Sequence, residues 1–191
     1  MATDPLAWFN ADRARARAAD DPMANLCTVA NVDADNRPQL RTLVLRDVDG
    51  VLGIFVNASS PKWPHLQETF ALATYWPSVS IQYRLQVRAE ALDPDIVAAS
   101  WMQRPDPPKR MDWLYHLHDA QSREIESREK LLAVLDNLPL ETPLRAPPDA
   151  RGILLRPEHI ERLDLTHDNG VHDRQQFRYV DGSWVQTTLI P

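Results

Sequence analysis

The amino-acid sequence predicts a mainly β fold, a closed antiparallel β-barrel with peripheral helices. About eight segments rich in β-branched and aliphatic residues are separated mostly by short turns. Three of these turns, Asp49-Gly50, Asp168-Asn169-Gly170 and Asp181-Gly182, contain residues that tolerate positive φ and are typical of hairpins. Helical spacing of apolar residues is confined to a few stretches, so helices are expected outside the barrel.

Strands are predicted at residues 26–32, 41–46, 51–57, 70–76, 79–92, 152–156, 159–165, 171–180 and 183–190. Alternation is clearest in 79–92, where Gln82, Arg84 and Gln86 share one parity and Ile81, Tyr83 and Leu85 share the other. One face of this strand is therefore expected to join the core. The other face is left for solvent, a partner subunit or a ligand.

Helical signals lie before the first predicted strand and between the later ones. Residues 1–22 are expected to form an N-terminal helix with Asp4 as N-cap and Pro5 at the first position. Further helices are predicted at 93–103 and 122–137, with a brief one at 60–69, and the Pro-rich stretch 138–150 reads as an extended loop. Arg13, Arg15 and Arg17 are interpreted as solvated surface, and Trp76, Trp101, Trp113 and Trp184 as packing residues. The whole chain, 1–191, is expected to be one domain.

Composition restricts the possible partners. The net charge of −6 argues against a nucleic-acid partner, because duplex binding requires a basic face. No apolar run is long enough for a membrane span or a signal peptide. A single cysteine, Cys27, excludes an intramolecular disulfide and fits a reducing compartment, so the cytoplasm is predicted. His116, His118 and Asp119 suggest a metal site only weakly, a surface or capping role is favoured, and no metal is predicted.

The stretch from Arg41 to Lys62 is the strongest candidate for a binding site. It is expected to form a hairpin that ends in an anion cradle, with Arg41, Ser60 and Lys62 as donors. In an unbroken strand Arg41 and Arg46 would point to opposite faces, because they are five residues apart. A bulge, a twist or separate contacts to two parts of one ligand would each reconcile them with a common site.

Taken in order, several motifs resemble the pyridoxamine 5′-phosphate oxidase family of FMN-binding split barrels, over roughly residues 23–191. The motifs are Arg41 to Arg46, Asn57 to Lys62, Tyr75-Trp76 through Gln82, Arg104-Pro105, Gln121-Ser122, and Val171-His172-Asp173-Arg174 through Trp184 to Pro191. The resemblance implies an antiparallel split β-barrel that works as a homodimer. FMN would be the cofactor and would lie in clefts at the subunit interface, where it would meet a small-molecule substrate.

Carried over by position, the resemblance implies two sets of binding residues. The FMN set is Arg41, Thr42, Leu43, Val44, Arg46, Phe55, Val56, Ser60, Lys62, Gln82, Gln121, Ser122 and Arg174. The substrate set is Arg46, Arg104 and His172. Ser122 is also a candidate helix N-cap, and the two roles are compatible. No catalytic proton-transfer residue is assigned, because in hydride transfer the cofactor performs the redox step.

Departures from the family pattern occur mostly on the substrate side. Arg46 stands where Lys is usual and Pro61 where Arg is usual, which leaves the cradle cationic. Gly170 replaces an Arg of the substrate site, while Ser100 and Pro108 replace a Tyr and a Ser that hold the substrate phosphate.

Three functions follow from the sequence. The first is an FMN-dependent oxidoreductase that passes a hydride between FMN and a substrate left unnamed. The second is a true pyridoxamine or pyridoxine 5′-phosphate oxidase, and the third is a non-catalytic dimeric flavin-binding protein.

Overall fold

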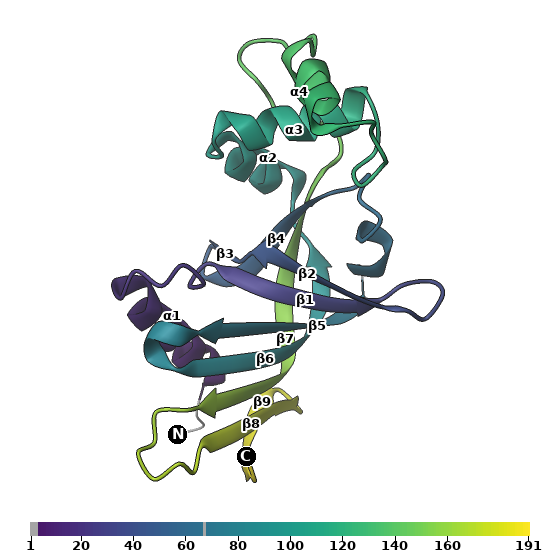
Figure 1. Ribbon diagram of the computed structural model, residues 1–191. Helices are drawn as coiled ribbons and strands as arrows, with labels where there is room; N and C mark the ends of the chain where they lie inside the picture. Colours follow the sequence, from purple (N-terminus) through teal and green to yellow (C-terminus); the bar gives the residue numbers. More distant parts are fainter. Residues whose placement is uncertain (1–3, 67) are drawn as a thin grey trace.

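The protein folds as a single antiparallel sheet that curls into a split barrel, with three helices gathered at one end (Figure 1). The computed structural model describes residues 4–66 and 68–191. The strands are β1 (Leu26–Val32), β2 (Pro38–Val44), β3 (Arg46–Val48), β4 (Val51–Asn57), β5 (Thr69–Trp76), β6 (Ile81–Ala91), β7 (Ala150–Asp164), β8 (Asp173–Val180) and β9 (Ser183–Leu189). The α-helices are α1 (Pro5–Ala18), α2 (Pro94–Met102), α3 (Asp106–Leu117) and α4 (Arg128–Asp136). Two short 3-10 turns, η1 (Trp63–Leu66) and η2 (Pro77–Val79), complete the elements.

The strand order shows why the barrel is split rather than closed. Hydrogen-bonded neighbours run β2-β1-β5-β6-β7-β4-β3, and the β8–β9 hairpin branches from β7. The path ends at β2 and β3, and within the described part of the chain no ladder joins these two strands. The predicted mainly β, antiparallel fold is confirmed as a split barrel, and the closure expected from residue pattern alone is corrected.

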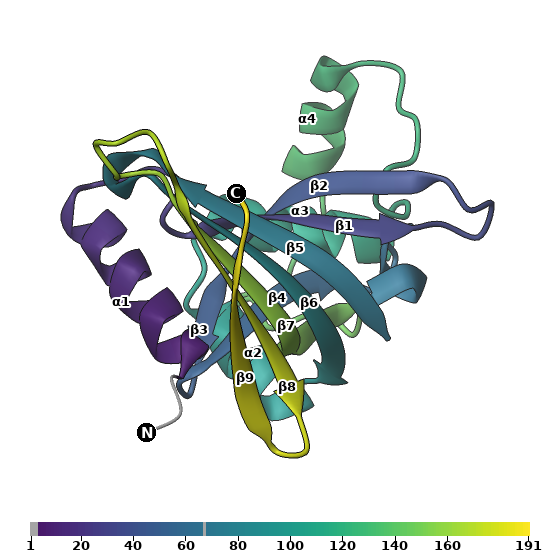
Figure 2. The same ribbon diagram turned by 90° about the horizontal axis from the view of Figure 1, so that it is seen from below.

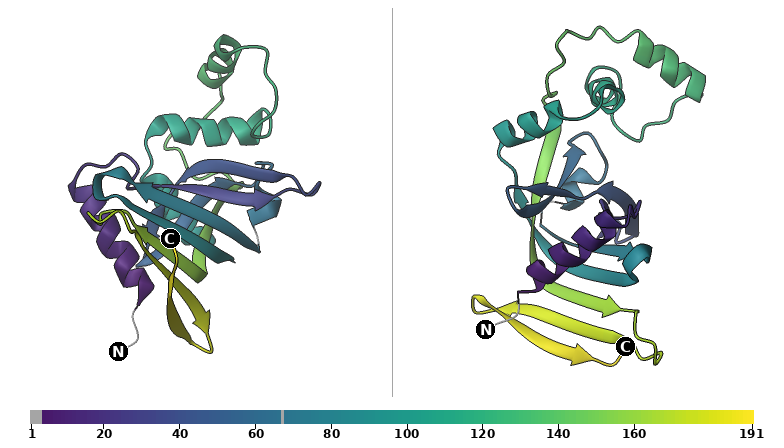
Figure 3. Two further views of the ribbon diagram at one scale, coloured as in Figure 1. Left: turned by 60° about the horizontal axis from the view of Figure 1, so that its bottom comes forward. Right: turned by 90° about the vertical axis from the view of Figure 1, so that its left-hand side faces the viewer.

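β7 is the longest of the described strands and connects the sheet to the β8–β9 hairpin. It pairs with β4 through residues 150–154, with β6 through 153–164, and with β8 through 159–164. Figure 3 shows it running from the helical end of the molecule to the β8–β9 hairpin. The sequence predicted two strands here because Pro157 cannot donate to a ladder. The structure accommodates Pro157 at a register shift opposite Gln86 and Val87, so a single bulged strand replaces the predicted pair.

The core lies against the inner face of β6, as the alternation predicted. Tyr83 and Ile81 are fully buried, whereas Arg84 on the other parity is exposed. Phe9 from α1 packs between Trp76 and Tyr83, with ring centroids 5.2 and 4.9 Å apart. These three aromatic rings fasten the N-terminal helix to the barrel.

α1 begins where the sequence predicted, but one of its arginines is not on the surface. The Asp4 carboxylate accepts from the Leu6 N–H at 3.0 Å and Pro5 occupies the first turn. Arg13 is 1% exposed and donates to the Ala24 carbonyl at 2.8 Å and the Leu45 carbonyl at 2.6 Å. The interpretation of Arg13 as solvated surface is therefore wrong. This buried side chain links α1 to the backbone before β1 and between β2 and β3. Residues 1–3 of the predicted helix lie outside the described residues.

The predicted strand 41–46 is interrupted at Leu45. β2 pairs only with β1 and ends at Val44, while β3 begins at Arg46 and forms the Asp49-Gly50 hairpin with β4. Leu45 is buried, and its carbonyl is held by Arg13. The interruption resolves the parity conflict between Arg41 and Arg46, because the two residues belong to different strands.

The helical end differs most from the sequence-based expectation. α3 was not predicted, because Pro107 and Pro108 read as a helix stop; both fall in its first turn, where missing N–H groups cost nothing. α4 begins at Arg128 rather than at residue 122, and its N-cap is Ser127, whose side chain accepts from the Lys130 N–H at 3.1 Å. The predicted 60–69 helix is only the 3-10 turn at Trp63–Leu66, and residue 67 lies outside the described part.

α1 lies on the opposite flank of the molecule from α4, and the β1–β2 hairpin projects away from α1 (Figure 2). None of the helices in the described ranges has the length and apolar character needed to cross a membrane.

Candidate functional site

A large cavity, with a volume of about 930 Å³, lies between the sheet and the helical end. Its walls come from β2, the β2–β3 junction, β4, the loop that follows β4, and helices α2 and α3. The sequence-predicted binding residues on these walls are Thr42, Leu43, Val44, Arg46, Phe55, Val56, Lys62, Arg104 and Gln121. Segments up to about 80 residues apart in sequence are thus brought to one cavity by the curl of the sheet.

Lys62 is the centre of a donor cluster on one side of the cavity. Its ammonium group donates to the Ser60 hydroxyl at 2.6 Å and to the Gln121 side-chain oxygen at 3.2 Å. The Gln121 backbone N–H in turn donates to the Ser59 hydroxyl at 3.1 Å. The 59–62 loop and the loop after α3 therefore support one another, and Ser60 is almost completely buried.

A second cation lies beside Lys62 without a carboxylate to balance it. Burial lowers the pKa of Lys62, and the neighbouring Arg41 guanidinium lowers it further. Burial also lowers the pKa of Arg41. Within residues 4–66 and 68–191, no acidic side chain forms an ion pair with either group. Two half-buried cations without a counter-ion form a site that an anion would stabilise.

The helical wall of the cavity contains a charged pair that the sequence did not reveal. Arg104 donates to the Asp112 carboxylate, which also accepts the Trp101 indole N–H at 2.7 Å. Asp112 lies on α3, the helix that was not predicted, and it is buried. Trp101, interpreted as packing, is buried too but lines the cavity. The sequence would have indicated the pairing of Asp112 with Arg104 only if α3 had been recognised as a helix.

Tyr115 is a further wall residue that the sequence did not reveal. Burial raises the pKa of its hydroxyl, and the nearby Asp112 carboxylate raises it as well. The side chain therefore stays a neutral hydrogen-bonding group at ordinary pH. It lies one helical turn beyond Asp112 on α3 and faces the same cavity.

Arg46 reaches the cavity from the opposite wall, just after the Leu45 interruption. Its side chain is exposed and has no hydrogen-bond or ion-pair partner in the described ranges. The adjacent Asp47 is held by Arg13 at 2.9 Å and Arg17 at 2.8 Å. Because Arg13 also binds the Leu45 carbonyl, α1 determines the direction in which Arg46 leaves the sheet.

The remaining predicted residues lie in a different place. Gln82, His172 and Arg174 line a second cavity of about 210 Å³, together with Glu161 and the C-terminal Pro191. The elements that form it, β6, β7 and the β8–β9 hairpin, lie at the end of the molecule away from helices α2, α3 and α4 (Figure 1). One chain therefore does not bring the two sets of predicted residues together.

In the second cavity some polar side chains have hydrogen-bond partners, and one buried polar atom has none. Arg174 donates to Glu161 at 2.7 Å, and Arg84 approaches the same carboxylate at 3.4 Å. Burial raises the pKa of Glu161, whereas Arg174 and Arg84 lower it, and the net result is a lowered pKa. In the described part of the chain, the buried Nδ1 atom of His172 has no partner.

Three other positions discussed from the sequence can be placed in the structure. Ser122 is exposed at φ 73° and is not a helix N-cap, so that reading is wrong, while its FMN contact stays a prediction. Gly170 lies in the exposed loop before β8 at φ 71°. The His116 Nδ1 atom lies 2.6 Å from an Asp149 carboxylate oxygen, at hydrogen-bond distance, which matches the surface role favoured for it.

Two solved structures share this architecture. One is PhzG from Burkholderia lata 383 in complex with tetrahydrophenazine-1-carboxylic acid, with a TM-score of 0.84, 22% identity, and coverage of 98% of this chain and 93% of that one. The other is a pyridoxamine 5′-phosphate oxidase-related, FMN binding protein from Nostoc punctiforme PCC 73102, with a TM-score of 0.80, 18% identity and full coverage of both chains. The fold is that of the FMN-binding split barrels.

Curated relatives narrow this class. The chain is 32% identical over 196 residues to the pyridoxine/pyridoxamine 5′-phosphate oxidase of Pseudomonas putida strain W619, covering 98% of this chain and 89% of the relative. It is 31% identical to the enzyme of that name from Saccharopolyspora erythraea, covering 96% and 82%. No family model matches the sequence. The chain belongs to the pyridoxine/pyridoxamine 5′-phosphate oxidase family.

Proposed function

We propose that this protein is an FMN-dependent oxidoreductase that passes a hydride between a small substrate and the flavin. The observation that carries the proposal is the pair of cations, Arg41 and Lys62, beside a cavity of about 930 Å³. A flavin phosphate carries close to two negative charges, which matches two cations that no carboxylate balances. The residues present therefore fit the phosphate end of FMN.

The fit extends beyond the phosphate. Contacts of about 1.5 to 3 kcal/mol each from Arg41 and Lys62 fall short of the roughly 8 kcal/mol of micromolar binding. The rest would come from burial of the ring against apolar walls such as Val44, Phe55 and Val56, which line the same cavity. Gln121 would hold the Lys62 ammonium in place, because it already accepts a hydrogen bond from it.

A bound flavin supplies the redox chemistry, since its ring accepts or returns a hydride. The chain's own residues would bind, orient and exclude water. Arg46 and Trp101 both line the cavity, so a substrate there would be held by a guanidinium group and an indole ring beside the proposed cofactor site. No side chain is assigned a proton-transfer role.

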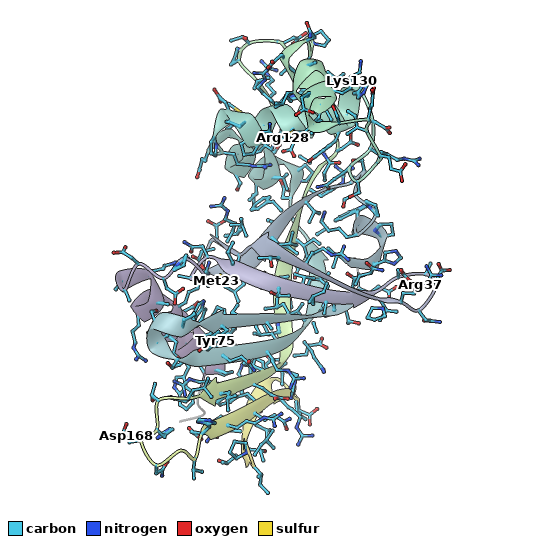
Figure 4. All side chains as sticks on the ribbon, in the orientation of Figure 1. Met23, Arg37, Tyr75, Arg128, Lys130 and Asp168 are labelled. Carbon is cyan, nitrogen blue, oxygen red and sulfur yellow. The ribbon has the colours of Figure 1, made fainter. Side chains whose placement is uncertain are left out.

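We further propose that the working unit is a homodimer whose sites are shared between two chains. The separation of Lys62 and Arg46 from Gln82, His172 and Arg174 supports this, because the two sets line different cavities. Apolar side chains also lie exposed on the sheet, including Leu40 (71% exposed) on β2 and Tyr75 on β5 (Figure 4). A second copy would cover such residues and add the small cavity of one chain to the large cavity of the other.

The cofactor proposal is tested on the protein as purified and after removal of any bound flavin. We expect the visible absorbance bands of a flavin, a mass that corresponds to FMN, and saturable uptake of FMN by the stripped protein with a Kd in the micromolar range or below. Protein without these bands that also takes up no FMN in the titration would refute the proposal.

The shared site is tested with two charge-reversal variants, Lys62→Glu and Arg174→Glu. If each site needs Lys62 from one chain and Arg174 from the other, both variants lose FMN binding, but a mixed dimer regains one intact site of two. With random mixing, about a quarter of the wild-type FMN capacity should return. Mixed samples that recover no binding, while sedimentation shows that dimers have exchanged, would rule out sites shared in this way.

A second candidate is a true pyridoxine or pyridoxamine 5′-phosphate oxidase, the activity in the names of the relatives. The presence of Arg46 and Arg104 in the large cavity favours it. Formation of pyridoxal 5′-phosphate by the FMN-loaded protein, followed by absorbance, decides between this activity and another substrate. For either candidate we place the reaction in the cytoplasm, which fits the single buried, free Cys27.

A further inference from the structure

The proposed phosphate cradle has fewer cations than the family pattern supplies. Pro61 stands where an Arg is usual, which leaves Arg41 and Lys62 as its two cations. A flavin phosphate carries close to two negative charges, and its terminal oxygens are strong hydrogen-bond acceptors. A further cation that reaches this wall of the cavity would therefore have unused acceptors to bind.

Arg151 reaches the same cavity from a neighbouring strand. It is the second residue of β7, at the helical end of the molecule (Figure 1), and it is half-buried. In the β4–β7 ladder it lies directly opposite Val56, and the side chains of directly opposed residues project from the same face of a sheet. Arg151, Val56 and Lys62 all line the cavity.

The face from which Arg151 projects is the face that also carries Arg41. Val56 packs against the main core cluster, so its face of β4 is the inner face of the barrel. Arg41 lies opposite Val29, which is fully buried in that same cluster. Arg151 and Arg41 are therefore on the inner face of the sheet, although they belong to different strands.

The other arginines of the cavity are less suited to this cradle. Arg17 and Arg104 are paired with carboxylates. Arg46 lies opposite Gly53, three positions before Val56 on β4. Because side chains alternate along a strand, a step of three positions changes the face. Arg46 thus projects from the outer face of the barrel, away from the inner face that carries the cradle cation of β2.

The Arg151 guanidinium is only partly committed to the protein. Its Nη1 atom donates to the backbone carbonyls of Pro148 and Ala150 at 2.6 and 2.9 Å, and both acceptors are neutral. Asp149, the nearest acidic residue in sequence, lies instead at 2.6 Å from the His116 Nδ1 atom. In the described part of the chain no carboxylate pairs with Arg151, and its Nε and Nη2 atoms have no partner. Two such N–H groups can bind a phosphate through parallel hydrogen bonds.

We propose that Arg151 is a third cation of the FMN phosphate cradle and takes the place of the guanidinium that Pro61 removes. The two bonds to backbone carbonyls would hold the side chain, and the Nε and Nη2 atoms would donate to phosphate oxygens. The proposal rests on the proposed function, because it takes the anion beside Arg41 and Lys62 to be the phosphate of FMN.

The test is a titration of the flavin-free protein with FMN and with riboflavin, followed by flavin fluorescence. Arg151→Gln keeps a polar side chain but removes the charge and the forked donors. We expect the Kd for FMN to rise at least about tenfold. The Kd for riboflavin, which lacks the phosphate, should stay unchanged. An unchanged Kd for FMN, or equal losses for the two ligands, would overturn the proposal.

A second substitution tests whether Arg151 replaces the arginine that is missing at position 61. Pro61→Arg in the Arg151→Gln background should recover most of the lost FMN affinity. Pro61→Arg alone should tighten FMN binding much less, because the phosphate is then already served from β7. Equal gains in the two backgrounds, or a folded double variant that stays as weak as Arg151→Gln, would contradict the replacement.

Two controls separate a phosphate contact from a general effect of charge. Arg156→Gln removes an arginine farther along β7 whose partner is Glu90 at 2.6 Å, and it should leave FMN binding unchanged. Arg151→Lys keeps the charge and should give a Kd between those of the wild type and Arg151→Gln. A loss in Arg156→Gln as large as that in Arg151→Gln would assign the effect to net charge and overturn the proposal.

The wild-type titration keeps this proposal distinguishable from the proposed function. Wild-type protein that takes up no FMN would refute the proposed cofactor, and this role of Arg151 with it. Wild-type protein that binds FMN, together with an Arg151→Gln variant that binds it equally well, would overturn only the role of Arg151.

Discussion

Replacing the buried Arg13 should be among the most damaging single changes in the chain. The guanidinium donates to the Ala24 and Leu45 carbonyls at 2.8 and 2.6 Å and pairs with Asp47 at 2.9 Å. Arg13→Met keeps the apolar stem but leaves both carbonyls without this donor. Each lost bond costs about 1 to 1.5 kcal/mol, and the half-exposed Asp47 pair adds less than about 1 kcal/mol after solvent screening. We expect a total loss of about 3 kcal/mol.

The measurement is urea unfolding at 25 °C, with thermal unfolding as a second readout. A loss of about 3 kcal/mol corresponds to a decrease in Tm of roughly 6 to 12 °C for a chain of this size. Arg15→Met is the matched control, since Arg15 lies on the same helix with its side chain 58% exposed and paired with Asp12 at 3.0 Å. That exposed pair should contribute less than about 1 kcal/mol.

A small cost of Arg13→Met would refute the role given to this side chain. If Arg13→Met costs less than 1 kcal/mol, or no more than Arg15→Met, then Arg13 does not hold the β2–β3 junction. Because Arg46 follows that junction directly, Arg13→Met should also weaken the binding of FMN, measured under conditions where the variant is folded. Unchanged FMN binding would separate the packing role of Arg13 from the site.

Three further predictions concern other parts of the molecule. Gly152→Ala would place a Cβ atom 2.6 Å from the Leu92 Cδ1 atom and 3.1 Å from the Val97 Cγ2 atom. We expect it to lower the free energy of unfolding in urea by about 1 to 3 kcal/mol. In a chain that already carries Leu92→Ala, the same substitution should cost much less. Asp21 accepts hydrogen bonds from Met23 and from the Ser78 N–H and hydroxyl, which hold its pKa below the usual range against the effect of burial. Its stabilising effect is therefore fully present above the unfolded-state pKa of about 3.9 and is lost as pH falls through the lower folded-state pKa. Asp21→Asn should cost about 1 to 2 kcal/mol at pH 7 and progressively less as pH falls below about 3.9; a cost that stays constant with pH would exclude this explanation. Lys62→Gln should raise the Kd for FMN at least about tenfold, whereas Lys130→Gln on α4 (Figure 4) should leave it unchanged; similar effects of both would remove Lys62 from the proposed cradle.

Much of the barrel was accessible from the sequence, because strands obey local rules. The alternation along β6 separated Tyr83 and Ile81 from Arg84 correctly, since side chains on a strand point to opposite faces in turn. The turn at Asp49-Gly50 was recognised from residues that accept positive φ, and both have it in the structure. The pairing of Ser60 with Lys62 was also accessible, because the two residues lie two positions apart, and the structure joins them by a hydrogen bond.

Other features depended on contacts between distant segments. Arg13 resembled any surface arginine until α1 packed on the barrel and buried it against Leu45. α3 was hidden by two prolines that only a helix start tolerates, and with it Asp112, which neutralises Arg104. The helix start was placed at Ser122, whereas α4 is capped by Ser127, and residues 121 and 122 lie in a loop whose Gln121 N–H donates to the Ser59 hydroxyl.

The sequence by itself determined the class of fold and the cationic end of the candidate site, since both follow from patterns within short segments. Only the tertiary structure decided which cations remain without a counter-ion and which predicted residues share a cavity. Charge balance in a folded protein depends on neighbours that the chain brings together from far apart, as with Arg174 and Glu161 on adjacent strands. For the same reason Arg41 and Lys62 remain available to an anion, while Arg104 does not.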